Sequence, residues 1–184
     1  MKIRLAADLQ TDSIVDGPGI RTVIWTQGCP HQCPGCHNPM THSFEDGCLV
    51  DVDLIKEEIS SLSHQTGVTF SGGDPMCQPE ACLALAKHCK QLNLDVWFYT
   101  GYTYEQIVQL AKQRTCILEL LTYIDVLVDG KFILDEKSLN LEFKGSRNQR
   151  VIDVPRTLET GIVTLYERKK IPIKGNKKPQ GVYI

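Results

Sequence analysis

The feature that most constrains the fold is a regular alternation of strand-like and helix-like segments. Strands are predicted where β-branched and aromatic residues cluster, at 22–26, 67–71, 95–100 and 125–129. Helices are predicted where apolar residues recur every three or four positions, at 51–63, 79–92 and 104–121, the last of them broken near residue 113. Residues 135–150 are polar and irregular, and a final strand is predicted at 161–166.

This alternation predicts βαβ units and a mainly parallel sheet. Ligand sites in such sheets lie beyond the carboxyl ends of the strands. The loops that contain Gly28, Gly72, Gly101 and Gly130 each follow a predicted strand, so they should share that edge. A complete eight-fold barrel typically needs about 250 residues, and this chain has 184. We therefore expect an α/β fold, an incomplete and open (βα) barrel.

The net charge and the hydropathy of the chain limit the kinds of molecule that it is expected to bind. The 20 basic and 22 acidic residues give a net charge of −2, so no global field favours nucleic acid or membrane. No apolar stretch approaches the length of a membrane span, and residues 1–8 break off before any signal-peptide run. We expect a cytoplasmic protein with no nucleic-acid or membrane partner.

The chain is predicted to form one domain over residues 1–166, followed by a basic tail at 167–184. The tail holds six Lys or Arg and one acidic residue. It is either a solvated segment or a docking surface for a protein or a nucleotide.

Three of the eight cysteines, Cys29, Cys33 and Cys36, form a C-x3-C-x2-C pattern. The cytosol keeps thiols reduced, which argues against a disulfide framework. Clustered thiolates suit an iron–sulfur cluster or zinc. A cubane cluster usually takes four cysteines, so three would leave one iron open to a ligand.

Two other metal sites remain open at this point. A zinc ion could use the three cysteines together with His31, His37 or Cys48. Alternatively, Cys48 could close a four-thiolate cluster for electron transfer. The remaining pair of regularly spaced cysteines, Cys82 and Cys89, lies on one predicted helical face and is expected in the core.

Glycine-rich segments accompany the cysteines. Asp16-Gly-Pro-Gly-Ile-Arg21 precedes the first predicted strand, and its arginine is available for an anionic group. Gly72-Gly73-Asp74-Pro75 follows the second, where glycines let the backbone approach a ligand closely. With the C-x3-C-x2-C loop, these segments resemble radical S-adenosylmethionine (radical SAM) enzymes, more narrowly the activases of glycyl radical enzymes.

Four further segments narrow the resemblance to activating proteins of anaerobic ribonucleoside-triphosphate reductase: residues 29–36, 99–104, 125–132 and 145–150. The resemblance covers about residues 10–155. It implies an oxidoreductase whose 4Fe–4S cluster, on Cys29, Cys33 and Cys36, cleaves S-adenosylmethionine to a 5′-deoxyadenosyl radical. That radical would remove a hydrogen from a glycine of the reductase. A flavodoxin or ferredoxin is the implied electron donor.

The resemblance also implies a set of cofactor-binding residues: Gly35, Cys36, His37, Gly72, Gly73 and Asp74. Gly73 is the candidate for the methionyl amine. The wider superfamily commonly has an aromatic residue at the position of Gly35 and Glu at the position of Asp74. The reductase-activase subgroup has Gly and Asp at these positions, as this chain does.

Other polar residues have two readings each. Thr100 and Asp129 either face the target glycine loop or an ion, or they cap turns. Arg147 and Arg150 either contact the partner or are solvated. Two rival functions complete the alternatives. One is an activase of another glycyl radical enzyme, such as pyruvate formate-lyase, and the other is a non-catalytic zinc-binding module.

Overall fold

The structure, a computed structural model, describes residues 1–168. Its strands are β1 (Lys2–Leu5), β2 (Gln10–Ser13), β3 (Arg21–Thr26), β4 (Cys48–Asp51), β5 (Gly67–Gly72), β6 (Asp95–Tyr99), β7 (Val126–Asp129) and β8 (Arg150–Asp153). Its helices are α1 (Val52–Ser61), α2 (Pro79–Gln91), α3 (Tyr104–Ala111), α4 (Cys116–Leu121) and α5 (Val154–Thr160). The short 3₁₀ turns are η1 (Pro39–Thr41), η2 (Pro75–Cys77) and η3 (Leu134–Glu136).

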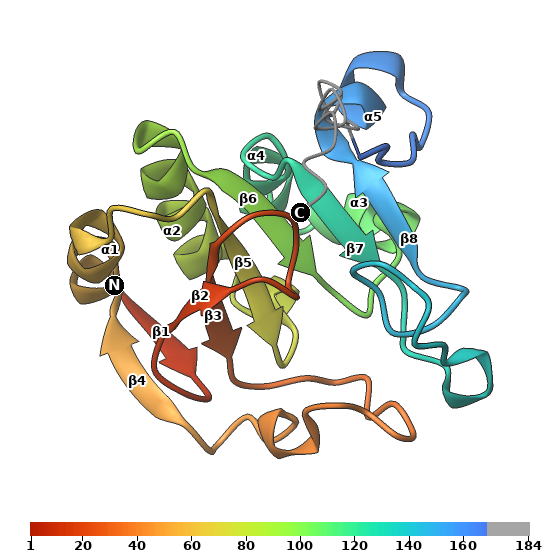
Figure 1. Cartoon of the computed structure of the whole chain (residues 1–184), viewed down its shortest axis with the longest axis horizontal. Coiled ribbons are helices and arrows are strands. Elements are labelled where there is room, and N and C mark those ends of the chain that lie inside the picture. Colours follow the sequence, from red (N-terminus) through yellow and green to blue (C-terminus); the bar gives the residue numbers. More distant parts are fainter. Residues whose placement is uncertain (169–184) are drawn as a thin grey trace, which may run out of the picture.

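The strands form one mixed sheet in the order β4-β1-β3-β5-β6-β7-β8, and β2 pairs with β3 beside this path. The four central strands, β3, β5, β6 and β7, are parallel neighbours. Their arrowheads point the same way in Figure 1. Antiparallel strands flank them on both sides. The predicted α/β fold with a mainly parallel central sheet is confirmed.

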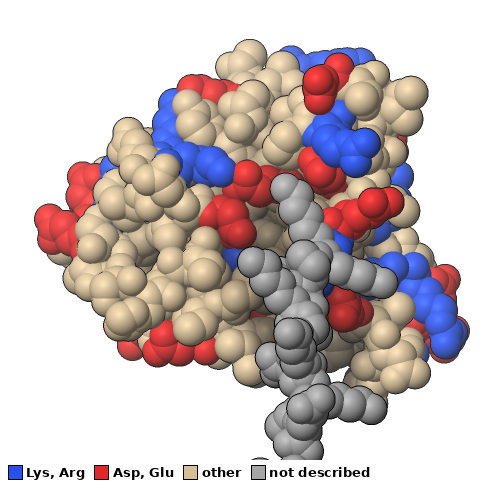
Figure 2. Space-filling model, turned by 45° about the horizontal axis from the view of Figure 1, so that its top comes forward, with Lys and Arg blue, Asp and Glu red and all other residues tan. Residues whose placement is uncertain are grey.

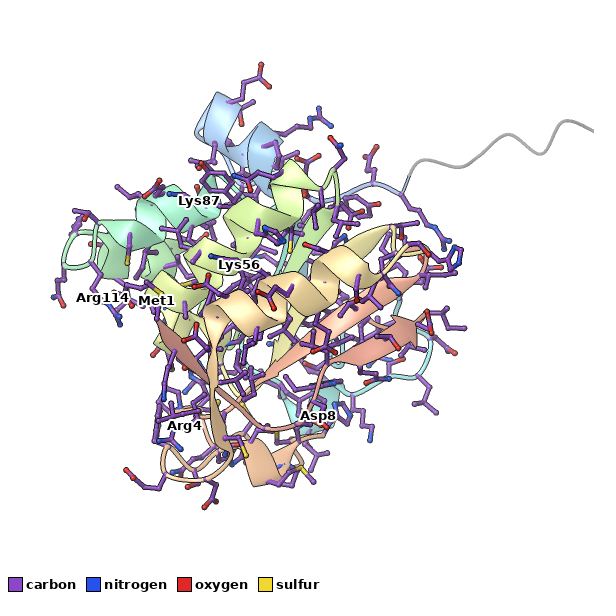
Figure 3. The ribbon with its side chains drawn as sticks, turned by 90° about the vertical axis from the view of Figure 1, so that its left-hand side faces the viewer. Met1, Arg4, Asp8, Lys56, Lys87 and Arg114 are labelled. Carbon is purple, nitrogen blue, oxygen red and sulfur yellow. The ribbon has the colours of Figure 1, made fainter. Side chains whose placement is uncertain are left out.

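The helices α1 to α4 cover one face of this sheet. Alternate strand residues such as Val96 and Phe98 enter a core with Ile55, Leu85 and Leu120 of the helices. Figure 3 views this layer from the side of α1, with Lys56 of α1 and Lys87 of α2 labelled. The opposite face of β6 and β7 has a separate apolar cluster of Trp97, Val126 and Val128. The sheet thus leaves one face to be lined by loops.

The central elements agree with the sequence prediction. The predicted break in the helix 104–121 separates α3 from α4. Cys82 and Cys89 of α2 are fully buried, as expected for core cysteines.

The margins differ from the prediction. A strand at 161–166 is wrong, because only Leu165 there forms a β-bridge, to Ile152. The helix just before this segment, α5, is absent from the prediction; its first turn is capped by Asp153, which accepts from the Arg156 N–H at 3.0 Å. The prediction lacks strands β1, β2, β4 and β8. Each has four residues, of which at most two are buried, whereas the predicted β7 is equally short but buried throughout.

The predicted basic tail, 167–184, lies outside the described residues beyond residue 168. On the face shown in Figure 2, acidic and basic side chains are interspersed. Across residues 1–168, no helix combines the length and apolar character needed to cross a membrane.

Candidate functional site

The cysteine loop, residues 27–47, leaves the carboxyl end of β3 and is fastened at its own base. The Gly28 N–H donates to the Thr41 carbonyl at 2.9 Å, and the Cys29 N–H donates to the His42 carbonyl at 3.1 Å. The side chain of Gln27, 3% exposed, adds a bond from Nε2 to the Ser43 carbonyl at 2.7 Å. Because these bonds close the loop, the cysteines between them are held at the sheet edge.

Neighbouring strands hold the same loop from outside. Arg4 of β1, labelled in Figure 3, donates to the carbonyls of Glu45 and Asp46 at 3.1 Å each. On the other side, the Asp74 N–H donates to the Gly28 carbonyl at 2.8 Å. The loop is therefore fixed between β1 and the segment that follows β5.

The three cysteines line one cavity of about 130 Å³ at the carboxyl ends of the parallel strands. The structure brings them together there with Gly72 and Gly73. Thr100, Gly101 and Gly130 complete this part of the wall. The loops that follow β3, β5, β6 and β7 thus meet at one site.

The donor set fits a cluster held by thiolates. All three thiols are partly exposed, and Cys36 Sγ accepts a hydrogen bond from the Asn38 N–H at 3.4 Å. Burial raises the pKa of the Cys29 thiol, and the backbone N–H groups of His31 and Gln32 act in the opposite direction. Hydrogen bonds to sulfur are one of the means by which proteins tune iron–sulfur clusters.

The alternative metal sites fit less well. Within residues 1–168, no three His, Cys, Asp or Glu side chains converge as a single metal ion requires. Cys48 is exposed at the start of β4 and is not part of the cavity wall. The His31 Nε2 atom is engaged with Asp74, and the exposed His37 ring lies against Phe132 at 4.9 Å between centroids.

The carboxylate of Asp74 is fully used inside the protein. The side chain is buried and accepts from the Thr100 hydroxyl at 2.9 Å and from the Gly101 N–H at 3.0 Å. It also accepts from the Met76 N–H at 2.9 Å and from His31 Nε2 at 2.6 Å. The bond from Thr100 shows that this residue stabilises the loop beneath the cavity.

The two glycines before Asp74 are required by close backbone approach. Gly72 has φ +99°, and a Cβ there would lie 2.6 Å from the Thr26 carbonyl oxygen. A Cβ on Gly73 would lie 2.5 Å from the Gly28 carbonyl oxygen. The Gly73 N–H is bonded to the Thr26 carbonyl at 2.7 Å. The N–H of Gly73 is therefore already paired within the protein, and Gly73 itself lies in the cavity wall.

A larger cavity of about 540 Å³ adjoins the first. The two share Cys36, Ser71, Tyr99, Phe132 and Gln149. The larger one extends over the helix-free face of the sheet to His37, Phe143 and Lys144. Gly35 is outside both walls: it has φ +72°, and a Cβ there would meet Leu134 Cδ1 at 2.8 Å.

Sequence reasoning missed Phe132, Phe143 and Lys144 as wall residues. Phe143 and Lys144 lie in the stretch 135–150, where the apolar residues show no periodic pattern. The only signal for them in the sequence is their apolar or basic character in a loop after a predicted strand.

Asp129 and Arg150 form a buried structural link. Asp129, 1% exposed, accepts from the Tyr104 N–H at 2.7 Å and from Arg150 Nε at 3.0 Å. Arg150 also binds Glu105, with Nη2 at 2.8 Å from Oε2. This link joins the ends of β7 and β8 to the start of α3. Arg147 is exposed.

The expectation that Arg21 is available for an anion is wrong. Its side chain is fully buried and donates to the Thr69 hydroxyl at 2.7 Å and to the Val68 carbonyl at 2.9 Å. It also pairs with Asp95 at 2.5 Å. The guanidinium lies over the Trp97 ring at 5.5 Å from its centroid, so its charge is used within the protein.

A family model described as a 4Fe-4S single cluster domain matches residues 15–152. The anaerobic ribonucleoside-triphosphate reductase-activating protein of Vibrio cholerae is 39% identical over 144 residues, covering 74% of this chain and 89% of the relative. The protein of that name from Enterobacteria phage T4 is 38% identical, covering 74% of this chain and 86% of the relative. The crystal structure of QueE from Escherichia coli aligns with a TM-score of 0.45 at 15% identity, over 56% of this chain and 54% of QueE.

The two reductase-activating proteins are matched over 89% and 86% of their length, and the residues that the family model matches include all three cysteines and the glycine-rich segment. The chain belongs to the family of anaerobic ribonucleoside-triphosphate reductase-activating proteins, with the 4Fe-4S single cluster domain of its family model.

Proposed function

We propose that this protein is a radical SAM activase that produces a glycyl radical on anaerobic ribonucleoside-triphosphate reductase. The observation that carries the proposal is the wall of the smaller cavity, where three cysteine thiols lie beside Gly73. Among the described residues, this wall contributes no fourth thiol. Cys29, Cys33 and Cys36 would hold one 4Fe–4S cluster, and the remaining iron would be free for S-adenosylmethionine.

The chain's own groups would bind and orient the cofactor. When bound, the cluster would supply the one electron for reductive cleavage of S-adenosylmethionine, and the resulting radical chemistry would be directed at the target glycine. The Gly73 carbonyl would accept from the methionyl amine. Tyr99 and Phe132, at the junction of the two cavities, would exclude water from the reacting atoms.

The protein substrate and the electron donor follow from the family. Relatives are named for activating anaerobic ribonucleoside-triphosphate reductase, and we infer that a reductase of this kind is the partner here. A flavodoxin or ferredoxin would supply the electron, and the reduced thiols suit the cytoplasm. Residues 1–166 would form a single radical SAM domain, an incomplete barrel whose open side admits the partner.

A metal and product assay tests the cofactor. The protein is reconstituted anaerobically with iron and sulfide, reduced with dithionite and given S-adenosylmethionine. We expect four irons and four sulfides per chain, in keeping with a cubane cluster, and formation of 5′-deoxyadenosine. Colourless protein with about one zinc and no sulfide would instead indicate the non-catalytic zinc module.

A spin assay tests the protein target. The reduced, loaded protein is mixed with anaerobic ribonucleotide reductase or, in parallel, with pyruvate formate-lyase. We expect the doublet of a glycyl radical in the electron paramagnetic resonance (EPR) spectrum of the first mixture. A doublet only in the second would reassign the partner, and a doublet in neither, with 5′-deoxyadenosine formed, would limit the function to cofactor cleavage.

A further inference from the structure

The ring of His31 is enclosed on three sides although it comes from the exposed turn between the first two cysteines. Its side chain is 7% exposed. The Nε2–H donates to Asp74 Oδ2 at 2.6 Å, and the Tyr102 ring lies edge-on at 4.5 Å between centroids. Gly101 covers another side, because a Cβ there would collide with His31 Cδ2. Such enclosure is not expected of a solvated loop histidine.

The acceptor of this hydrogen bond is itself immobilised. Asp74 is bound by the hydroxyl of Thr100 and by the backbone N–H groups of Gly101 and Met76. These donors come from the loops after β5 and β6, so the carboxylate belongs to the rigid edge of the sheet. The His31–Asp74 bond therefore ties the cysteine loop to that edge at a point 43 residues away in the sequence.

The backbone next to His31 is strained. Gln32 has φ +47°, in the left-handed region that residues other than glycine seldom adopt. Such conformations persist where the surrounding structure over-determines them. The backbone N–H groups of His31 and Gln32 lower the pKa of the Cys29 thiol, against the effect of its burial.

We propose that His31 is a positioning residue for the cluster: its bond to Asp74 fixes the backbone of residues 31 and 32, which lies between the ligands Cys29 and Cys33, and so fixes the N–H groups beside the Cys29 sulfur. The inference rests on the proposed function, because it needs a cluster on Cys29. N–H groups aimed at a ligating sulfur stabilise the more negative, reduced state and raise the reduction potential. They also hold the ligand, as outer hydrogen bonds do in other metal sites.

Three substitutions separate the hydrogen bond from the shape of the ring. His31→Leu keeps much of the volume and removes the donor, and His31→Asn is polar but too short to reach Asp74. His31→Gln places an amide donor near the position of Nε2. Because Asp74 keeps three other donors, we expect all three variants to fold, which urea unfolding of the metal-free proteins checks. His64→Ala, at an exposed position before β5, is the matched control.

The readouts are the midpoint potential of the reconstituted cluster, from an EPR-monitored redox titration, and the rate of iron loss to a chelator. We expect His31→Leu and His31→Asn to have a more negative potential and a roughly ten- to hundred-fold faster loss of iron. His31→Gln and His64→Ala should match the wild type in both.

Two outcomes would overturn the inference. One is a wild-type potential and iron retention in both His31→Leu and His31→Asn. The other is a His31→Gln protein as impaired as His31→Leu, which would show that ring packing and not the hydrogen bond matters. Either result would leave the proposed function standing if the wild type holds its cluster. A wild-type protein without a 4Fe–4S cluster would refute the proposed function itself.

Discussion

At Gly73 two stretches of backbone approach so closely that only glycine fits. A Cβ would lie 2.5 Å from the Gly28 carbonyl oxygen and 2.9 Å from its carbon. We expect Gly73→Ala to push the glycine-rich segment away from the cysteine loop, at a cost of about 1–3 kcal/mol of overpacking. The Gly73 carbonyl would move with it, so S-adenosylmethionine should bind more weakly, as measured by the cofactor-induced change in the EPR spectrum.

Gly161→Ala is the control for this substitution. Gly161 has φ +71°, and a Cβ added there would have no neighbouring atom within 4 Å, so alanine costs only backbone strain, about 1–2 kcal/mol. Urea unfolding should show a loss of stability in both variants. Weaker cofactor binding in both would show that Gly73 acts through overall stability.

For single residues, the sequence predicts groupings that are local in the chain, whereas contacts between distant residues are seen only in the structure. The spacing of Cys29, Cys33 and Cys36 is local, and the loop that carries them closes within a few residues of the pattern, so the sequence predicts the ligand set. The partner of Asp74 is His31, 43 positions away. No periodicity links them, and only the register of β3 with β5 brings them together.

The sequence predicts an element where the element is long or where its buried residues form a regular pattern. Helix α2 has thirteen residues with its apolar positions in register, which gives an unambiguous period. The marginal strand β2, Gln-Thr-Asp-Ser, is polar and has one buried residue. Its strand structure comes from pairing with β3, a tertiary contact that propensity does not report.

Helix α5 depends on its cap because it is only seven residues long. Asp153 accepts from the Arg156 N–H at 3.0 Å, one of the donors that a helix start leaves unpaired. We expect Asp153→Ala to destabilise the protein by about 1 kcal/mol in urea unfolding. Asp153→Asn should retain most of the stability, and an equal loss in both variants would assign the effect to charge.

The ion pair between α3 and β8 gives a prediction for pH. Hydrogen bonding by Arg150 lowers the pKa of Glu105 to about 2. The folded state therefore favours the ionised carboxylate, and the stabilisation is complete above the unfolded pKa of about 4.3 and is lost as pH falls toward 2. Glu105 is 60% exposed, so solvent screening limits the contribution to about 1 kcal/mol or less.

The measurement is the difference in unfolding free energy between wild type and Glu105→Gln across this pH range. The difference should be present at pH 6, shrink below about pH 4 and vanish near pH 2. Glu57→Gln, at an exposed position of α1, is the control and should show no such dependence. A pH-independent difference at Glu105 would contradict the role of the ion pair.

For the whole molecule, the proposed cluster should stabilise the fold. A ligand that binds the folded state and not the unfolded one raises the free energy of unfolding by mass action. We expect anaerobically loaded protein to unfold at a higher temperature than the metal-free protein. Cys33→Ala should lose iron, sulfide and this gain together, whereas Cys48→Ala should keep all three. Loss of the cluster in Cys48→Ala would support the four-thiolate alternative.

The two hydrogen bonds that close the cysteine loop, from Gly28 to Thr41 and from Cys29 to His42, join backbone groups. Their integrity does not depend on iron. Oxygen that strips the metal would then leave the scaffold in shape, and the enzyme could be recharged when anaerobic conditions return, without new synthesis.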